Sequence, residues 1–144
     1  MRQSARAILL DDRSRLLLIR RTRTDRPVYW STPGGTVEPA DADLESTMRR
    51  ELLEELGATA GPARLVFSTT RTFDDGTAAL QHFFVCRLLT LDLSRRNGPE
   101  FAKPDLGGFD LERIVVGGDG TVGVNLQPQP LKAFIEANWP ALTA

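Results

Sequence analysis

The chain has 144 residues, of which 41% are hydrophobic and 26% are charged, and this composition excludes a disordered or fibrous protein. Domains commonly have about 100–150 residues, so residues 1–144 are expected to form one domain. With 18 basic and 19 acidic residues the formal net charge is -1, which gives no overall attraction to a nucleic acid polymer or an acidic membrane. Any anion that the protein binds must therefore be held locally.

Cysteine content and apolar runs narrow the class further. A single cysteine, Cys86, excludes internal disulfides, and a single histidine, His82, leaves the usual Cys/His zinc patterns incomplete. The longest apolar runs, Ala7–Leu10 and Leu16–Ile19, are far shorter than the roughly 20 residues of a membrane helix. We therefore expect a cytoplasmic protein without a targeting segment, and we expect His82 and Cys86 to pack within an apolar strand.

The first segments of the chain predict β-strands. Ser4–Leu10 and Arg15–Arg20 are expected to form a hairpin, and the second of them is apolar enough to be buried on both faces. A basic loop follows, and then Pro33-Gly34-Gly35, where the glycines allow backbone conformations and close approaches that other residues do not. A bound group is therefore expected against the Gly-Gly loop.

A helix is predicted over Asp41–Leu56, because leucine or methionine recurs there every four residues. The recurring residues are Leu44, Met48, Leu52 and Leu56. Asp41 or Asp43 can cap the start of this helix, and Gly57 can end it.

The second half of the chain predicts a hairpin, a long loop, two short strands and a closing helix. These are, in order, Arg64–Phe73 with Ala78–Leu89, then Thr90–Gly108, then Asp110–Val116 and Thr121–Val124, and finally Gln129–Trp139. A mixed β-sheet with two helices is an α/β (α+β) sandwich.

Three glutamates gather on the last turns of the predicted long helix. At about 100° per residue, Glu51, Glu54 and Glu55 span an arc of roughly 100° beside the apolar stripe. Like charges so placed cost about 0.2–0.5 kcal/mol and oppose the helix dipole, so local stability does not account for them. They are either a solvated helix face or a set of oxygen ligands for a hard cation such as Mg²⁺, which would neutralise a pyrophosphate and activate water.

The segment from Gly35 to Ala58 resembles the signature of the Nudix hydrolases. Its second half, Arg50-Glu51-Leu52-Leu53-Glu54-Glu55-Leu56-Gly57-Ala58, matches the family pattern Arg-Glu-apolar-any-Glu-Glu-any-Gly-apolar at every position. The first glutamate of the pattern is replaced by Asp41 with one extra residue before Arg50, or by Ala42 if the later spacing is kept. We expect this position to support the helix start, a part that Asp43 could also take. The resemblance implies the family's α/β/α sandwich.

The resemblance also assigns roles in chemistry. Glu54 and Glu55 match Mg²⁺ ligands, Glu51 matches a ligand or general base, and Arg50 matches an arginine that orients these carboxylates. Gly34 matches the glycine whose carbonyl reaches the metal. Family members can also use an acid from a loop, for which Glu100 is the best candidate and Asp75, Asp92 and Asp105 are rivals.

Four further residues are candidates for binding the substrate. Arg20 and Arg21 could meet phosphates through their planar guanidinium groups, or form a solvated basic loop. Trp30 could stack on a base or belong to the core. Asn125 resembles in placement a base-reading asparagine of some family members, although a turn or cap is its alternative use.

The resemblance implies a Mg²⁺-dependent hydrolase, with Mn²⁺ as a substitute metal. Its partner would be a small molecule, a nucleoside diphosphate linked to another moiety, and the hydrolysed bond would be the diphosphate linkage. The protein could form a homodimer, and the resemblance covers several nucleoside diphosphate derivatives as substrates. The alternatives are a non-catalytic nucleotide-sensing module on the same scaffold, against which the intact Glu51, Glu54 and Glu55 weigh, and a structural domain with a charged helix.

Overall fold

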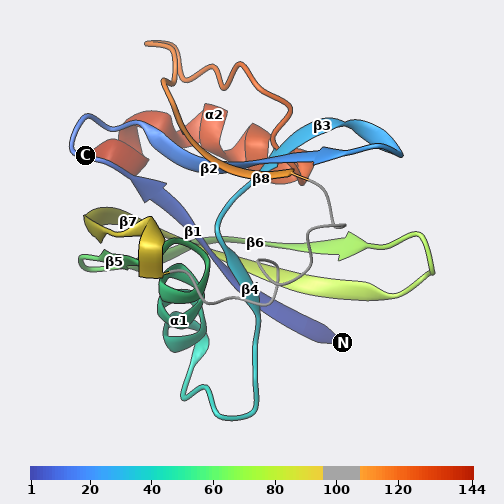
Figure 1. The fold of residues 1–144 in the computed structure, drawn as a ribbon. Coiled ribbons are helices and arrows are strands. Elements are labelled where there is room, and N and C mark those ends of the chain that lie inside the picture. Colours follow the sequence, from blue (N-terminus) through green and yellow to red (C-terminus); the bar gives the residue numbers. More distant parts are fainter. Residues whose placement is uncertain (96–107) are drawn as a thin grey trace.

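The computed structural model describes residues 1–95 and 108–144, which form a mixed eight-stranded sheet and two α-helices (Figure 1). The strands are β1 (Arg2–Leu10), β2 (Leu16–Arg23), β3 (Arg26–Ser31), β4 (Gly34–Thr36), β5 (Ala58–Ala60), β6 (Arg64–Thr72), β7 (Ala78–Leu91) and β8 (Gly108–Ile114). The helices are α1 (Leu44–Leu56) and α2 (Gln129–Thr143), and a short 3-10 helix, η1 (Leu93–Arg95), follows β7. Neither α-helix in the described part of the chain is long and apolar enough to cross a membrane.

Strand β1 connects the two parts of the sheet. It pairs in parallel with β7 from Arg2 to Leu10 and antiparallel with β4. Its pairing with β2 is confined to Leu10 and Leu16, beside the turn. Strand β2 instead pairs with β3 and β8, so these three strands lie together above β1, β6 and β7 in Figure 1.

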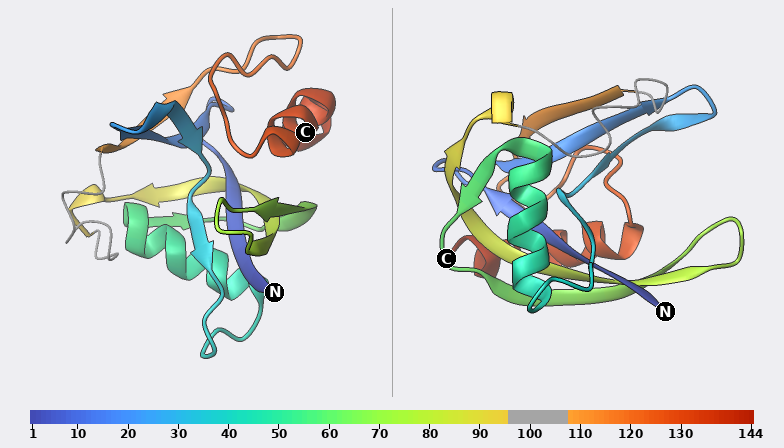
Figure 2. Two further views of the ribbon diagram at one scale, coloured as in Figure 1. Left: turned by 90° about the vertical axis from the view of Figure 1, so that its right-hand side faces the viewer. Right: turned by 60° about the horizontal axis from the view of Figure 1, so that its bottom comes forward.

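The two helices cover opposite faces of β1 (Figure 2). Side chains alternate between the faces of a strand, and both sets of β1 side chains are buried. Ala5, Ala7 and Leu9 pack in the cluster that contains Met48, Leu52 and Leu56 of α1. Ile8 and Leu10 pack in the cluster that contains Leu131 and Ile135 of α2. The predicted α/β/α sandwich with a mixed sheet is confirmed.

Helix α1 begins and ends at residues that the sequence identified. Asp43 is its N-cap, and the Asp43 carboxylate accepts a hydrogen bond from the Ser46 N–H at 2.7 Å. Gly57 is its C-cap in the left-handed conformation, and an added Cβ there would collide with the Asp92 carbonyl oxygen. The helix therefore starts at Leu44, which leaves Asp41 outside it and available for another contact.

Several other predicted elements differ from the observed ones. The predicted β1–β2 hairpin is wrong beyond its turn, because each strand finds longer partners elsewhere. Strands β3, β4 and β5 were not predicted from the sequence, and β4 includes the two glycines of the predicted loop. The hairpin of β6 and β7 is confirmed by continuous antiparallel pairing, and most of the predicted Thr90–Gly108 loop lies outside the described residues.

The predicted strand at Thr121–Val124 is also wrong. This segment is irregular, and the Val122 N–H donates to the Glu136 carboxylate of α2 at 2.8 Å. A side chain thus satisfies the backbone group that a neighbouring strand would have satisfied. Helix α2 continues to Thr143, past the predicted end at Trp139, and Pro140 lies inside it.

A buried carboxylate fixes the turn between β1 and β2. The Asp11 side chain is 1% exposed, and it accepts hydrogen bonds from the backbone N–H groups of Arg13 and Arg15, both at 2.9 Å. It also pairs with the Arg15 Nε at 2.7 Å and with the Arg113 Nη1 of β8 at 2.9 Å. Burial opposes ionisation of Asp11, but these hydrogen bonds outweigh it and lower the pKa of Asp11 to about 2.

Replacing this carboxylate should destabilise the protein in a pH-dependent way. The pKa of Asp11 is lower in the folded state than its ordinary value of 3.8, so its stabilising contribution is complete above about pH 4 and is lost as the pH falls towards 2. We expect Asp11→Asn to lower the free energy of unfolding by about 2 kcal/mol at pH 7, with a smaller difference at pH 3, measured by urea unfolding. The neighbouring exposed Asp12, as Asp12→Asn, is the control, and equal losses in both variants would contradict the expectation.

Candidate active site

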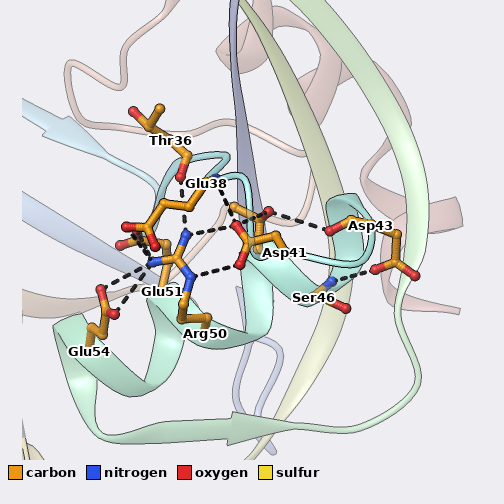
Figure 3. A network of polar contacts seen from close by, with 9 residues as sticks. Thr36, Glu38, Asp41, Asp43, Ser46, Arg50, Glu51 and Glu54 are labelled. Carbon is orange, nitrogen blue, oxygen red and sulfur yellow. Dashed lines mark hydrogen bonds and ion pairs between the residues drawn. The ribbon is translucent and has the colours of Figure 1, made fainter.

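Arg50 of α1 lies at the centre of a cluster of carboxylates, defined here as the Arg50 cluster of Asp41, Arg50, Glu51 and Glu54 (Figure 3). The Arg50 Nε and Nη2 donate to the two oxygens of Asp41 at 3.0 and 2.9 Å. The Arg50 Nη1 donates to Glu51 at 2.9 Å and lies 3.3 Å from Glu54. These contacts, above all those with Asp41, raise the pKa of Arg50 further above its ordinary value, so the guanidinium is a permanent cation among the acids.

Asp41 is held in place from several sides. Besides Arg50, its carboxylate accepts hydrogen bonds from the Thr47 hydroxyl at 2.7 Å and from the Glu38 N–H at 2.9 Å. The side chain is 7% exposed. The hydrogen bonds from Arg50, followed by those from Glu38 and Thr47, hold the pKa of Asp41 well below its usual range. Of the residues that could replace the missing glutamate of the signature, Asp41 therefore makes the pair with Arg50, while Asp43 caps the helix.

The Gly-Gly loop contacts α1 through a buried hydrogen bond. The Gly34 N–H donates to the Glu55 carboxylate at 2.8 Å, and Glu55 is 3% exposed. Gly34 has φ +146°, and an added Cβ would lie 2.5 Å from the Ala5 carbonyl oxygen. Only glycine fits this approach of the loop to β1. The loop and the helical glutamates thus meet through the N–H of Gly34, whereas the role that the resemblance implies belongs to the Gly34 carbonyl.

Gly35 leaves room for a second glutamate. An added Cβ on Gly35 would lie 2.5 Å from the Glu51 carboxyl carbon. The Glu51 carboxylate therefore occupies the space that a larger residue in the loop would need. The two glycines together bring Glu51 and Glu55 against one loop from the same helix.

The donor chemistry of these residues fits a hard divalent cation, because all the donors are carboxylate or carbonyl oxygens. Across residues 1–95 and 108–144, however, no three acidic, histidine or cysteine side chains are grouped closely enough to hold a metal as they stand. Arg50 lies between Glu51 and Glu54, and Glu55 is turned to Gly34. The glutamates share one arc of the helix, but Glu51 and Glu54 are bonded to Arg50 and Glu55 is bonded to Gly34.

Of the residues predicted to bind the substrate, some line the cavity beside Glu55 or its neighbouring groove and others do not. Arg21 lines a cavity beside Glu55, whereas Arg20 is not among the residues that line it. The Trp30 Nε1 donates to Glu112 at 2.6 Å, and the indole packs against the core on the α2 side. Asn125 lines a groove that adjoins the cavity, and its amide donates to the Val28 carbonyl at 3.2 Å.

The other predicted candidates take structural positions or lie outside the described residues. Asp75 and Asp92 accept hydrogen bonds within their own turns, from Thr77 and Ser94, whereas Glu100 and Asp105 belong to the undescribed segment. Cys86 is buried, which raises the pKa of its thiol to about 11. His82 is only half-buried on the same strand, and its ring is hydrogen-bonded on both sides.

Sequence reasoning missed several polar residues that line the cavity beside Glu55, namely Arg6, Tyr29, Arg71, Gln81 and Gln127. A signal for two of them is present in the sequence. Arg6 interrupts the apolar segment of β1 and Gln81 interrupts that of β7, and polar residues at such positions are uncommon unless they face a partner or a ligand.

Comparisons of the sequence and of the fold with known proteins identify the family. The NUDIX domain family matches residues 1–112. A NUDIX hydrolase from Nitrosomonas europaea shares the fold with a TM-score of 0.71 at 19% identity, over 97% of this chain and 88% of that one. For a MutT protein from Methanosarcina mazei Go1 the TM-score is 0.70 at 20% identity, over 99% of this chain and 95% of that one. The E. coli ORF135 protein has a TM-score of 0.59 at 25% identity, over 100% of this chain and 91% of that one. No curated protein sequence matches the chain.

The match over residues 1–112 covers most of the chain, and the chain belongs to the Nudix family of hydrolases. The family and the enzyme class predicted from the signature are thereby confirmed. Nudix hydrolases generally use divalent metal ions and act on small nucleotide derivatives.

The pair of Asp41 and Arg50 should be needed for activity. Asp41→Asn keeps the size of the side chain but removes the charge and the two-pronged acceptor, so Arg50 is freed to swing towards Glu51 and Glu54. We expect turnover of a diphosphate substrate to fall by about tenfold or more, as is typical when a residue that orients a metal ligand is lost. Asp43→Asn is the matched control, because asparagine caps a helix as well as aspartate does. Equal turnover in the two variants would contradict the positioning role of Asp41.

Proposed function

We propose that this protein hydrolyses the diphosphate linkage of a nucleoside diphosphate joined to another moiety, with Mg²⁺, or Mn²⁺ in its place, as cofactor. The metal ligands would be Glu51, Glu54 and Glu55 with the carbonyl of Gly34. The observation that carries the proposal is the approach of the Gly-Gly loop to α1, in which Glu55 is bonded to Gly34 and Glu51 fills the space beside Gly35. The MutT proteins among the similar structures support it.

The chain's own residues would prepare the acids for this reaction. A bound divalent cation would neutralise phosphoryl oxygens and make water more acidic. Arg50 orients Glu51 and Glu54 through its contacts with both carboxylates. Glu51 is our first candidate for the base that accepts a proton from the attacking water. Glu100 remains a candidate for an additional acid.

The nucleotide would extend from the glutamates into the cavity and the adjoining groove. Arg21 lines the cavity, and Asn125 lines the groove with Tyr29. A non-catalytic nucleotide sensor would need this pocket but not the acids, so the complete set of glutamates favours hydrolysis. A cytoplasmic location, a single domain and a homodimer stay predictions of the sequence.

Activity should depend on a divalent metal ion. Carboxylates that hold Mg²⁺ are expected to lose it to a chelator, so hydrolysis should disappear with EDTA and return with added Mg²⁺ or Mn²⁺. The measurement is release of products from a panel of diphosphate compounds. Full turnover in metal-free buffer would contradict the proposed cofactor.

Removal of one carboxylate charge should separate catalysis from stability. Glu54→Gln keeps the shape of a partly exposed side chain, and we expect turnover to fall by on the order of 10²-fold. The melting temperature without metal should stay level, because crowding of like charges is relieved while a contact with Arg50 is weakened. Glu54 suits this test better than Glu55, whose burial ties it to folding.

Glu45→Gln is the control for this experiment. Glu45 lies on the same helix and pairs with Arg49 at 3.0 Å on the surface, where an ion pair contributes little. Unchanged turnover in both variants, with an active wild type, would show that Glu54 is not a metal ligand.

A further inference from the structure

Arg6 occupies a position on β1 that an apolar residue would fill more readily. It is half-buried and belongs to the row of β1 side chains that continues with Ile8 and Leu10, both of which are buried in the core on the α2 side. The Arg6 Nε atom is itself buried, and it has no hydrogen-bond partner within residues 1–95 and 108–144. A buried donor without a partner destabilises a fold, so local stability does not account for an arginine here.

The charges around Arg6 lead to the same conclusion. Burial lowers the pKa of Arg6, Glu55 opposes this shift, and Arg21 and Arg71 add to it. Two cations therefore repel the guanidinium, while its attraction is mainly to one carboxylate of α1. What the arginine contributes must lie in the contacts that it makes.

The guanidinium of Arg6 holds the backbone that leads into the Gly-Gly loop. Its Nη1 donates to the Thr32 carbonyl at 2.8 Å. The carbonyl of the next residue, Pro33, accepts a hydrogen bond from the Ala7 N–H at 2.9 Å. Two consecutive carbonyl groups are thus turned towards β1, one held by a side chain and the other by the backbone.

The aliphatic part of Arg6 packs against the first glycine of the loop. Arg6 and Gly34 lie opposite each other in the pairing of β1 with β4. An added Cβ on Gly34 would lie 2.5 Å from the Arg6 Cα and 2.6 Å from the Arg6 Cγ. The same glycine donates its N–H to Glu55 at 2.8 Å. Arg6 therefore contacts the loop at two points, directly behind the peptide group that meets α1.

Arg6 also faces the glutamate that the loop contacts. Arg6, Gly34 and Glu55 line the same cavity, whose volume is about 60 Å³. The Glu55 side chain belongs to a residue that is only 3% exposed, and little solvent is present there to screen the attraction between the two charges. The head group of Arg6 thus draws Glu55 towards the loop that its stem supports.

We infer that Arg6 is a positioning residue, which holds Thr32 and Gly34 against β1 so that the Gly-Gly loop keeps its contact with Glu55. This inference rests on the proposed function, because that function assigns Gly34 and Glu55 to the metal ion. Arg6 acts on the reaction through these two residues and needs no contact with the substrate. The loss of a residue that orients metal ligands typically weakens metal binding or activity by about 10- to 100-fold.

The first measurement follows the loop without metal or substrate. Amide hydrogen exchange of Gly34, recorded by NMR on the metal-free protein, reports how often its hydrogen bond to Glu55 opens. Arg6→Met keeps an unbranched apolar stem but loses the charge and the bond to Thr32. We expect it to speed the exchange of Gly34 by about tenfold, as for the loss of one hydrogen bond, and to leave the amides of β7 unchanged.

Arg2→Met is the matched control for this measurement. Arg2 lies in the same row of β1, but its side chain is exposed and does not line the cavity beside Glu55. We expect its Gly34 amide to exchange as in wild type. Unchanged exchange of Gly34 in Arg6→Met would overturn the inference.

The second measurement is binding of Mn²⁺ alone, detected by the EPR signal of the free ion. A positioning role predicts that Arg6→Met binds Mn²⁺ about tenfold more weakly. An effect of charge alone predicts the opposite, because removal of a cation beside the carboxylates favours another cation. Tighter or unchanged binding in Arg6→Met would therefore overturn the inference. Arg6→Lys, which keeps the charge and can donate to Thr32, should recover most of the loss.

Kinetics separate positioning from direct contact with the substrate. With a diphosphate substrate, we expect Arg6→Met to raise the Mg²⁺ concentration for half-maximal turnover by about tenfold. The KM for the substrate at saturating Mg²⁺ should equal that of wild type. A higher KM at saturating Mg²⁺, with an unchanged Mg²⁺ requirement, would make Arg6 a substrate contact and overturn the positioning role.

Failure of the proposed function would give a different result. A wild type that neither binds Mn²⁺ nor hydrolyses any diphosphate compound would overturn that function and any role of Arg6 in it, whereas exchange of Gly34 would still show whether Arg6 holds the loop. Should Arg6→Met fail to fold, Arg6→Gln carries the same measurements. Its amide nitrogen stands at the level of the Arg6 Nε, which makes no bond to Thr32.

Discussion

Burial of β1 on both faces is the constraint on which the rest of the structure depends. Ala5, Ala7 and Leu9 require a helix on one side, and Ile8 and Leu10 require one on the other. Small residues on the first side let α1 approach closely, so that its glutamates reach the Gly-Gly loop, which pairs with the same strand. The sandwich and the candidate active site are therefore consequences of one strand. Arg6 departs from this apolar alternation, and it lines the cavity beside Glu55.

Local patterns predicted local structure well and long-range pairing poorly. The spacing of Leu44, Met48 and Leu52 identified α1, and the hairpin of β6 and β7 is marked by its own turn. The partner of β1, by contrast, is β7, about 75 residues further along the chain, and nothing near β1 specifies that pairing. The error at Thr121–Val124 has the same cause, because its backbone is satisfied by a side chain of α2.

The part of the candidate site that lies on α1 was predictable from the sequence. The glutamates follow from helical spacing and from the family signature, but the partner of Arg50 does not. Asp41, Ala42 and Asp43 were open alternatives, and they were separated only by the path of the loop, which brings Asp41 to Arg50 and Thr47. The cavity beside Glu55 combines residues from six strands and from α1, and such a combination is invisible until the sheet is assembled.

The position of Arg50 among the acids bears on whether the protein must bind a metal ion before it can fold. Because a guanidinium already screens Glu51 and Glu54, the chain meets no large repulsion when α1 forms, and it folds without waiting for a cation. On the proposed function, an incoming metal ion would compete with an internal cation that cannot diffuse away, so it would bind more weakly than to bare carboxylates and would exchange more readily. Arg50 is thus a resident counter-ion of these glutamates, and on the proposed function it would let the fold assemble before any metal is bound.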